Sequence, residues 1–323
     1  MNTYKAVLIN EFTTNLDDYH ITNVLRVPPK GAQVEVQVHA AAVNKIDYGR
    51  AAGALVAVYP NELPMKIGYD VAGIVTSVGT HATKFKVGDR VYGCVNHDEI
   101  GTIAEYVLSE EAHLAELPSN IEFTAGASVP LAGLTAKQAM DAGHAEGKET
   151  IFVSGGMGGV GMFGVALARH HFKAQNVLTT VSTSKVEYAK KMGATQVVDY
   201  TKEDHTKVLE SAADMVFDSI GDTESYKVAK PNTVVASVVP ISDKSKMDKV
   251  LSDFKTKNVR YVLNITVPSG PELERTFNPL LESKELKPII PEVFEFTNEG
   301  VRAAFKRAIG GHVTGKVVIR VRD

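Results

Sequence analysis

The chain has 323 residues, a formal net charge of -3 and a single cysteine. This length allows about two domains with ample core, and the hydrophobic and charged fractions, 44% and 23%, are those of an ordinary globular protein. No dense Lys/Arg cluster and no apolar run near the roughly 20 residues that span a bilayer are present, which argues against nucleic-acid and membrane partners. One cysteine excludes an intrachain disulfide and a multi-cysteine zinc site.

The first residues, MNTYKAVLIN, lead straight into an apolar strand-like segment, without the basic region, apolar core and cleavage site of a secretory signal. We therefore expect a cytoplasmic protein. Cys94 lies in the β-like run DRVYGCVN. It is expected to be a small core residue rather than a catalytic thiol, because no activating partner is visible nearby in the sequence.

Up to about residue 123 the chain consists of short β-like segments separated by Pro, Gly, Asn and Asp. They cover residues 4–9, 33–43, 71–79, 89–95 and 104–108. The second segment alternates with period two at Val34, Val36 and Val38. This pattern predicts a compact, mostly antiparallel β domain.

From about residue 123 an alanine-rich, helical segment leads to IFVSGGMGGVG at 151–161, where an apolar run stops at five closely spaced glycines. Gly156, Gly158 and Gly161 fit the spacing GxGxxG. In that motif the first glycine permits a tight turn, the second lets a pyrophosphate approach the backbone and the third allows close helix packing. The residues predicted to bind the pyrophosphate of a dinucleotide are Gly156, Gly158, Gly159 and Val160.

A glycine run alone is equally consistent with a plain tight loop. Here it opens a regular alternation, in which β-rich runs at 176–181, 195–200, 214–221 and 232–239 are joined by short helical segments. Such alternation predicts a parallel sheet covered on both faces, with a dinucleotide bound where the first strand ends.

The C-terminal part contains two helical candidates, 271–283 and 297–309 with Thr297 as a cap, and a final strand at 314–321. These pieces are too few for a domain of their own and are expected to complete the first one. We place the β domain at 1–124 and 267–323 and the dinucleotide domain at 125–266. The segment RYVLNITV, 260–267, is expected to be a sheet edge, which is a natural pairing surface.

Motifs along nearly the whole chain resemble those of a known protein family. They include VNKIDYGRAAG at 43–53, GYDVAGIVTSVG at 68–79, FKVGDRVYG at 85–93 and GTIAEYV at 101–107, followed by the glycine run and GHVTGKVVIRV. In this order they resemble the zinc-independent medium-chain dehydrogenases/reductases, in the branch of quinone oxidoreductases and 2-alkenal (enone) reductases. The resemblance implies an α/β protein with a GroES-like, mostly antiparallel β domain and a Rossmann doubly wound parallel sheet. It also implies a homodimer paired through the edge strand.

The positions that hold zinc ligands in zinc-dependent relatives are occupied by other residues. Those relatives carry a cysteine, a His-Glu pair and a second cysteine where this chain has Asn44, Tyr69-Asp70 and, approximately, Leu131. A catalytic zinc needs about three N, S or O ligands beside an open position. We therefore predict no metal site, and alcohol oxidation with zinc is disfavoured.

The expected coenzyme is NADPH. An NAD-preferring Rossmann domain presents Asp or Glu about 20 residues after the glycine turn, and none lies between Gly161 and Glu187. The hydroxyls and the cation of the segment STSK would instead stabilise a 2'-phosphate. By resemblance, Lys185 and Tyr200 match positions that contact the 2'-phosphate in related quinone reductases. The alternative is that Ser184 caps the next helix and Lys185 is solvated. The predicted set is Ser182, Thr183, Ser184, Lys185 and Tyr200.

This combination predicts metal-free hydride transfer to a small electrophile, a quinone or the C=C bond of an α,β-unsaturated carbonyl. Charge then develops on the carbonyl oxygen, and the candidate donors to it are Asn44, Tyr59 and Thr135. Tyr59 lies in a loop-like stretch and is equally consistent with packing. No side chain stands out as the general acid, so solvent is the expected proton source. An alternative function is an NADPH-binding protein with a structural, sensing or partner-binding role and little turnover.

Overall fold

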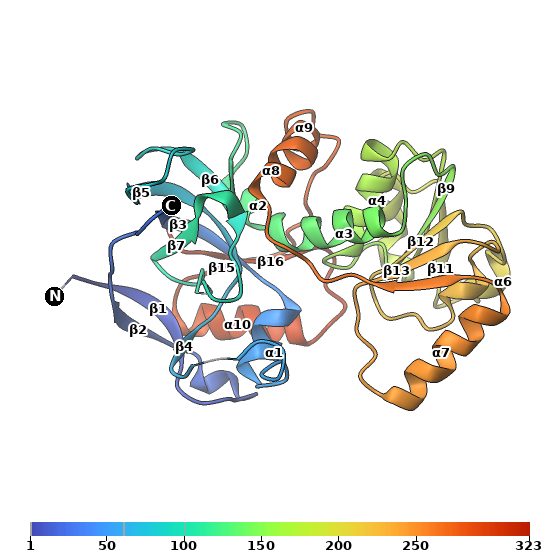
Figure 1. Cartoon of the computed structure of the whole chain (residues 1–323), viewed down its shortest axis with the longest axis horizontal. Helices are drawn as coiled ribbons and strands as arrows, with labels where there is room; N and C mark the ends of the chain where they lie inside the picture. Colours follow the sequence, from blue (N-terminus) through green and yellow to red (C-terminus); the bar gives the residue numbers. More distant parts are fainter. Residues whose placement is uncertain (1, 61, 100) are drawn as a thin grey trace. The chain divides into compact units, whose positions relative to one another are not determined.

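The computed structural model describes residues 2–60, 62–99 and 101–323, which form two compact units (Figure 1). The first unit comprises Met1–Leu131, Pro268–Glu282 and Pro288–Asp323, and the second comprises Ala132–Val267 and Ser283–Lys287. The units change at Leu131 rather than at residue 124, because α2 (Phe123–Ala127) packs on strands of the first unit. The short return of Ser283–Lys287 to the second unit is not visible in the sequence pattern.

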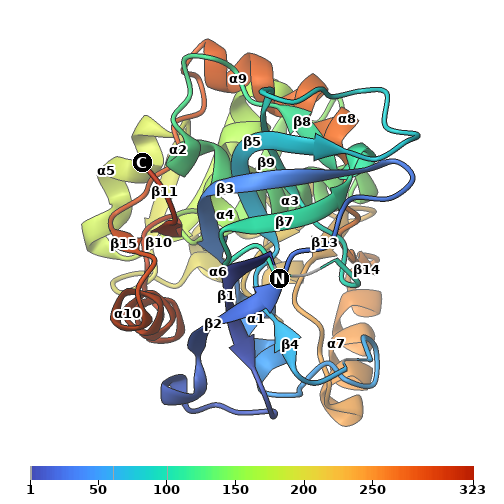
Figure 2. The same ribbon diagram turned by 90° about the vertical axis from the view of Figure 1, so that its left-hand side faces the viewer.

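The larger sheet of the first unit has the strand order β15-β16-β3-β5-β6-β8. Strand β7 also pairs with β3, at the edge opposite β5 (Figure 2). Only the β15-β16 pair is parallel among the pairs described in this sheet. The strands are β3 (Gln33–Val43), β5 (Asp70–Val78), β6 (Arg90–Cys94), β7 (Tyr106–Glu110), β8 (Leu114–Glu116), β15 (Val293–Glu295) and β16 (Val317–Arg320).

A smaller antiparallel sheet in the same unit has the order β2-β1-β4, from β1 (Thr3–Ile9), β2 (His20–Leu25) and β4 (Met65–Lys66). Val34, Val36 and Val38 of β3 are fully buried, as their alternation predicts. The unit also contains α1 (Lys45–Ala51), which follows directly on β3 and Asn44.

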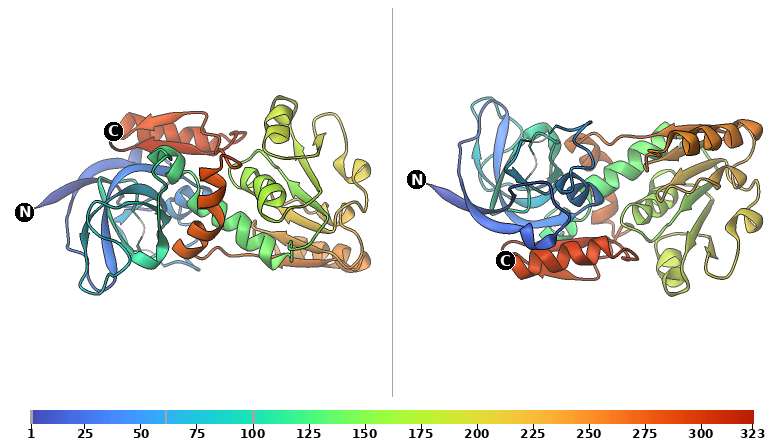
Figure 3. Two further views of the ribbon diagram at one scale, coloured as in Figure 1. Left: turned by 90° about the horizontal axis from the view of Figure 1, so that it is seen from above. Right: turned by 90° about the horizontal axis from the view of Figure 1, so that it is seen from below.

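The C-terminal segment joins the first unit. β16 pairs with β3, with Val317 opposite Val43, and α10 (Asn298–Ile309) packs on β15 and β16 (Figure 3, red). The Thr297 hydroxyl accepts a hydrogen bond from the Gly300 amide, so the predicted helix and its cap are confirmed. The region predicted as one helix at 271–283 is helical but broken into α8 (Gly270–Glu272), a π turn (Leu273–Phe277) and α9 (Asn278–Glu282).

The second unit is a parallel sheet of order β11-β10-β9-β12-β13-β14, which confirms the predicted doubly wound fold. Its strands are β9 (Thr150–Ser154), β10 (Asn176–Val181), β11 (Gln196–Asp199), β12 (Met215–Asp218), β13 (Val234–Ser237) and β14 (Arg260–Leu263). β14 ends the sheet, as expected for an edge strand. Its helices are α3 (Pro130–Ala142), which begins in the first unit, α4 (Gly161–Ala166), α5 (Val186–Lys191), α6 (His205–Val208) and α7 (Lys244–Thr256).

The sequence did not predict α7. The apolar signal was present, because Met247, Val250, Leu251 and Phe254 recur at helical spacing in this lysine-rich segment, and Val250 and Phe254 are buried. Across the described residues, no helix combines the length and the apolar character needed to cross a membrane.

Candidate coenzyme and substrate sites

The glycine turn connects β9 to α4. The left-handed backbone belongs to Gly155, with φ of +63°, and not to Gly156 as the motif suggested. A Cβ atom on Gly156 would lie 2.0 Å from the Thr179 hydroxyl oxygen of β10. Gly156 is therefore needed for close packing against β10, and the tight turn is made one residue earlier.

The next two glycines of the motif differ in the space around them. A Cβ on Gly158 would meet nothing closer than the Gly155 carbonyl oxygen at 3.4 Å, whereas a Cβ on Gly161 would lie 2.2 Å from that same oxygen. Gly161 therefore serves close packing, as expected. The open side of Gly158 is where a ligand can approach the backbone, and it fits a pyrophosphate. Gly159 and Val160 complete this turn, and Val160 is the first residue before α4.

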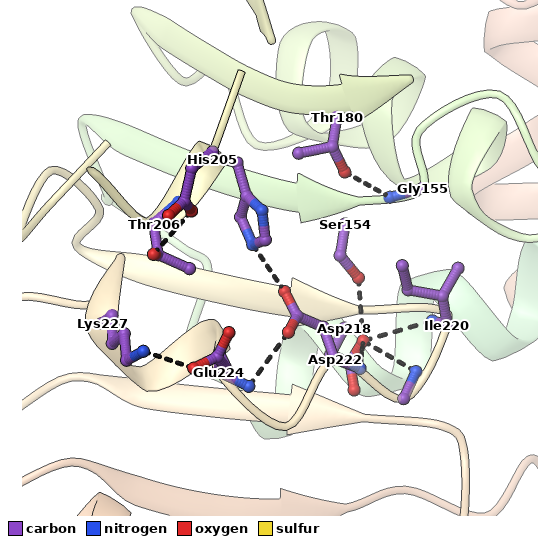
Figure 4. Close-up of polar contacts among 12 residues, drawn as sticks. Ser154, Gly155, Thr180, His205, Thr206, Asp218, Ile220, Asp222, Glu224 and Lys227 are labelled. Carbon is purple, nitrogen blue, oxygen red and sulfur yellow. Dashed lines mark hydrogen bonds and ion pairs between the residues drawn. The ribbon is translucent and has the colours of Figure 1, made fainter. Parts of the chain in front are cut away.

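Asp218, at the end of β12, organises the loop beside the glycine turn (Figure 4). This buried carboxylate accepts hydrogen bonds from the hydroxyls of Ser154, at 2.8 Å, and Ser237, at 2.7 Å. One of its oxygens also accepts three backbone N–H bonds, from Ile220, Gly221 and Asp222. The loop contacts the turn, because a Cβ on Gly155 would lie 2.4 Å from Ile220. Sequence reasoning missed Asp218, although an acidic residue that ends an apolar strand is a usable signal.

The same loop is tied to α6 by a histidine. His205 Nε2 lies 2.8 Å from an oxygen of Asp222, whose other oxygen accepts the Glu224 amide (Figure 4). The hydrogen bond with Asp222 raises the pKa of His205 against the opposing effect of burial, and the charges of Asp222, Asp204 and Glu224 act in the same direction. Folding therefore favours protonation of His205 relative to the unfolded chain.

This pair predicts a pH-dependent stability. Because the pKa of His205 is raised in the folded chain, the His205–Asp222 pair contributes fully to the free energy of unfolding below the ordinary histidine pKa of about 6.5. This contribution is lost as pH rises through the folded pKa. We expect His205→Gln to lower the free energy of unfolding by up to about 1 kcal/mol at pH 6 and by less at pH 9, as for a partly exposed ion pair. Urea unfolding of both proteins at the two pH values measures this. An equal difference at both would contradict it.

The residues predicted to bind the 2'-phosphate gather at one edge of the sheet. Ser182 follows β10 and leads into a single 3-10 turn, Thr183–Lys185, and Tyr200 follows β11 and is 50% exposed. They come together because β10 and β11 are parallel neighbours, with Val181 opposite Asp199. Ser184 is not a helix cap: the residue before α5 is Lys185.

The structure adds a carboxylate to this edge. The Thr183 hydroxyl donates to Asp199, and the Thr201 hydroxyl and amide donate to it as well. These hydrogen bonds lower the pKa of Asp199 to about 2, and the bond from Thr183 has the largest effect. The Thr183 proton is thus directed at Asp199, while Lys202 Nζ lies 3.4 Å from the same carboxylate. A scan for acids close to the turn in sequence misses Asp199, because β11 delivers it from the neighbouring strand.

In the first unit, Asn44 belongs to a buried polar cluster. Its Nδ2 donates to an oxygen of Asp70 at 2.7 Å and, more weakly, to the Ala42 carbonyl at 3.3 Å. The Lys316 ammonium donates to the Asn44 side-chain oxygen and also contacts Asp70 at 3.3 Å. The second Asp70 oxygen accepts the Leu131 amide at 2.7 Å. The side chains of Lys316 and Asp70 are 4% and 0% exposed.

This arrangement does not fit a catalytic zinc. Of the residues at the expected ligand positions, Asn44 and Asp70 are both bonded to the ammonium of Lys316, and Leu131 offers no side-chain ligand atom. The phenol oxygen of Tyr69 accepts a hydrogen bond from Arg50 Nη1 at 2.6 Å. Among the described residues, no group of three His, Cys, Asp or Glu could hold a metal ion.

Three further polar residues of the first unit were considered or lie close to Asn44. The backbone amide of Asn44 donates to Asp47 at 2.6 Å, and burial raises the pKa of Asp47 to about 7. The ring of Tyr59 lies with its centroid 4.7 Å from that of His97, which is consistent with the packing alternative. Cys94 is free and buried, and burial raises the pKa of its thiol, which confirms the core interpretation.

Thr135, the third predicted donor, lies on α3 in the second unit. Its hydroxyl oxygen is 2.6 Å from that of Thr266, and either can be the donor. The pair leaves one hydroxyl proton to be directed elsewhere, because two hydroxyls share one hydrogen bond. Whether Asn44, Tyr59 and Thr135 act on a substrate stays a prediction.

The doubly wound sheet, the open Gly158 backbone and the β unit with its polar cluster define a nicotinamide-dependent oxidoreductase. Comparison with known proteins agrees. Residues 30–119 match the alcohol dehydrogenase GroES-like domain, and residues 192–319 match the zinc-binding dehydrogenase model. The chain belongs to the medium-chain dehydrogenase/reductase family, in the branch of quinone oxidoreductases and enone reductases.

Three relatives illustrate this membership. The chain is 37% identical to a 2-methylene-furan-3-one reductase of Solanum lycopersicum, over 94% of this chain and 77% of the relative. It is 34% identical to a chloroplastic NADPH-dependent alkenal/one oxidoreductase of Arabidopsis thaliana, over 92% and 74%. The solved quinone oxidoreductase of Coxiella burnetii superposes with a TM-score of 0.89 at 27% identity, covering 99% of this chain and 100% of that one.

Proposed function

We propose that this protein is an NADPH-dependent reductase that transfers hydride, without a metal, to the C=C bond of α,β-unsaturated carbonyls or to quinones. The main supporting observation is the buried Lys316 ammonium, which contacts Asn44 and Asp70, two of the residues at the positions of the zinc ligands in zinc-dependent relatives. Relatives named for furanone, alkenal/one and quinone substrates support this substrate class.

The bound coenzyme would be held through its pyrophosphate at the open backbone of Gly158 and would supply the hydride. An electron-poor alkene accepts hydride at its β-carbon and places negative charge on the carbonyl oxygen, so the protein must offer hydrogen-bond donors there. Asn44 can offer its second amide hydrogen, whose bond to the Ala42 carbonyl is long at 3.3 Å. Thr135 and Tyr59 are the other proposed donors. Solvent is the proposed source of the proton at the α-carbon.

Turnover assays with a panel of small enones and quinones test this function, read as loss of the near-ultraviolet absorbance of NADPH. We expect oxidation of NADPH with at least one of them. Tight NADPH binding without turnover on any electrophile would instead support a structural or sensing role for the coenzyme.

The preference for NADPH over NADH is expected to depend on Lys185. A lysine near a phosphate dianion contributes about 1.5–3 kcal/mol through charge-assisted hydrogen bonding, or about 10- to 100-fold in affinity. We expect Lys185→Ala to weaken NADPH binding by that range and to leave NADH binding unchanged, as measured by isothermal titration. Lys191→Ala, at the far end of the helix α5 that follows Lys185, is the matched control. Equal affinity of the wild type for both coenzymes would overturn the prediction.

A homodimer paired through the β14 edge is also proposed, since this strand ends the sheet. Light scattering at the monomer mass would refute it. The cytoplasmic location predicted from the sequence stays a proposal as well, because curated relatives include chloroplastic proteins. Fluorescence imaging of the tagged chain in its own cells would decide it.

A further inference from the structure

A buried lysine of the first unit lies outside the predicted chemistry. Lys316 immediately precedes β16, and its amide donates to the Ile289 carbonyl at 2.9 Å, so its backbone is fixed. The pairing of Val317 with Val43 places Lys316 beside Asn44, the residue after Val43. The 4% exposed side chain then directs its ammonium at Asn44 and Asp70 rather than at solvent.

The two charged partners distinguish the two ends of the Asn44 carboxamide. Its oxygen faces the Lys316 ammonium and its Nδ2 faces the Asp70 carboxylate. A flipped amide would set N–H groups against the ammonium and the oxygen against the carboxylate, and both contacts would be repulsive. The ion pair therefore holds one orientation of the amide, in which the second N–H points along the long bond to Ala42.

We propose that Lys316 is a positioning residue: together with Asp70 it fixes the orientation of the Asn44 carboxamide, so that Asn44 presents an N–H to the substrate oxygen. This inference rests on the proposed reductase function, in which Asn44 is a donor to that oxygen. Lys316 itself acts only through Asn44. Its effect on turnover should therefore vanish when Asn44 is removed.

A double-mutant cycle tests the dependence. Wild type, Lys316→Met, Asn44→Ala and the double variant are compared in kcat with a small enone that the wild type reduces, and in Kd for NADPH. We expect Lys316→Met to lower kcat by about tenfold or more, the size of effect that a small misplacement of a catalytic group produces. The expected further loss on adding Lys316→Met to Asn44→Ala is less than about twofold. Losses that multiply would overturn the proposal.

A variant in which both Lys316 and Asp70 are neutral distinguishes a positioning role of Lys316 from a merely structural one. Lys316→Met alone leaves Asp70 buried without its cation, and it should lower the melting temperature. In Lys316→Met/Asp70→Asn no buried charge is unpaired, so we expect the melting temperature to recover while kcat stays low, because the amide is no longer held in one orientation. Recovery of both would show that Lys316 only balances charge and would overturn the proposal. Lys84→Met, which breaks the partly exposed pair with Glu274 in the same unit, is the control and should keep wild-type kcat.

A measurement without turnover keeps the inference distinct from the proposed function. In protein labelled with nitrogen-15 at asparagine, the Asn44 side-chain signal is the one that disappears in Asn44→Ala. We expect it to shift or double in Lys316→Met/Asp70→Asn and to be unchanged in Lys84→Met. An Asn44 signal identical to the wild type in the neutralised variant would overturn the proposal even if the wild type reduced every substrate. A wild type without any turnover would refute the reductase function alone.

Discussion

An alanine at position 158 is expected to leave the fold intact and to weaken NADPH binding by about 10- to 100-fold. Its methyl group would meet only the Gly155 carbonyl oxygen, at 3.4 Å, and Gly158 is not among the residues with positive φ. The group would however occupy the open side of the turn. The loss of one charge-assisted bond to phosphate corresponds to about 1.5–3 kcal/mol, which is that range in affinity. Isothermal titration measures it.

Gly156→Ala provides the contrast, since its Cβ would lie 2.0 Å from the Thr179 hydroxyl oxygen. Overpacking of this kind costs about 1–3 kcal/mol of stability. We expect a lower melting temperature of the coenzyme-free protein for Gly156→Ala and an unchanged one for Gly158→Ala. If Gly158→Ala bound NADPH as tightly as the wild type, the pyrophosphate would not lie against this backbone.

Removing the Asp218 carboxylate is expected to destabilise the chain by about 3 kcal/mol or more. Asp218→Ala leaves the hydroxyls of Ser154 and Ser237 and three backbone amides without their acceptor. Each buried donor left without a partner costs about 1–3 kcal/mol unless water replaces the carboxylate. Urea unfolding measures the change. Because the freed loop contacts the glycine turn at Gly155, NADPH affinity should fall as well.

Two control variants show whether the loss of stability comes from the hydrogen bonds of Asp218. Asp218→Asn keeps one oxygen as an acceptor and should lose about half as much stability. Asp248→Ala removes a carboxylate that is 61% exposed and paired with Lys244, so a change of less than about 1 kcal/mol is expected. An Asp218→Ala protein as stable as Asp248→Ala would show that the loop is held by other contacts.

The dinucleotide fold could be predicted because its signals are local. Each strand of the second unit is a short apolar run bounded by turns, and the glycine spacing marks where the first strand ends. Helix α7 carries a local signal as well, in Met247, Val250, Leu251 and Phe254 at helical spacing, but it was not predicted.

The polar site residues were harder to predict, because their roles depend on pairing between distant strands. Asn44 was found by its motif, but Lys316 reaches it only through the register of β16 on β3. Asp199 reaches Thr183 in the same way, through the register of β11 on β10. Asp218 was visible in sequence as an acid ending a strand, yet its five donors come from two other strand ends and a loop.

The measurement that tests the central claim most directly follows the hydride itself. The wild-type protein is supplied with NADPH carrying deuterium at the transferred position and with a small enone, and the product is analysed by mass spectrometry and proton NMR. We expect a saturated ketone with one deuterium at the β-carbon and a solvent-derived hydrogen at the α-carbon. Deuterium at the carbonyl carbon of an allylic alcohol, or no transfer to any enone or quinone despite bound NADPH, would contradict the account.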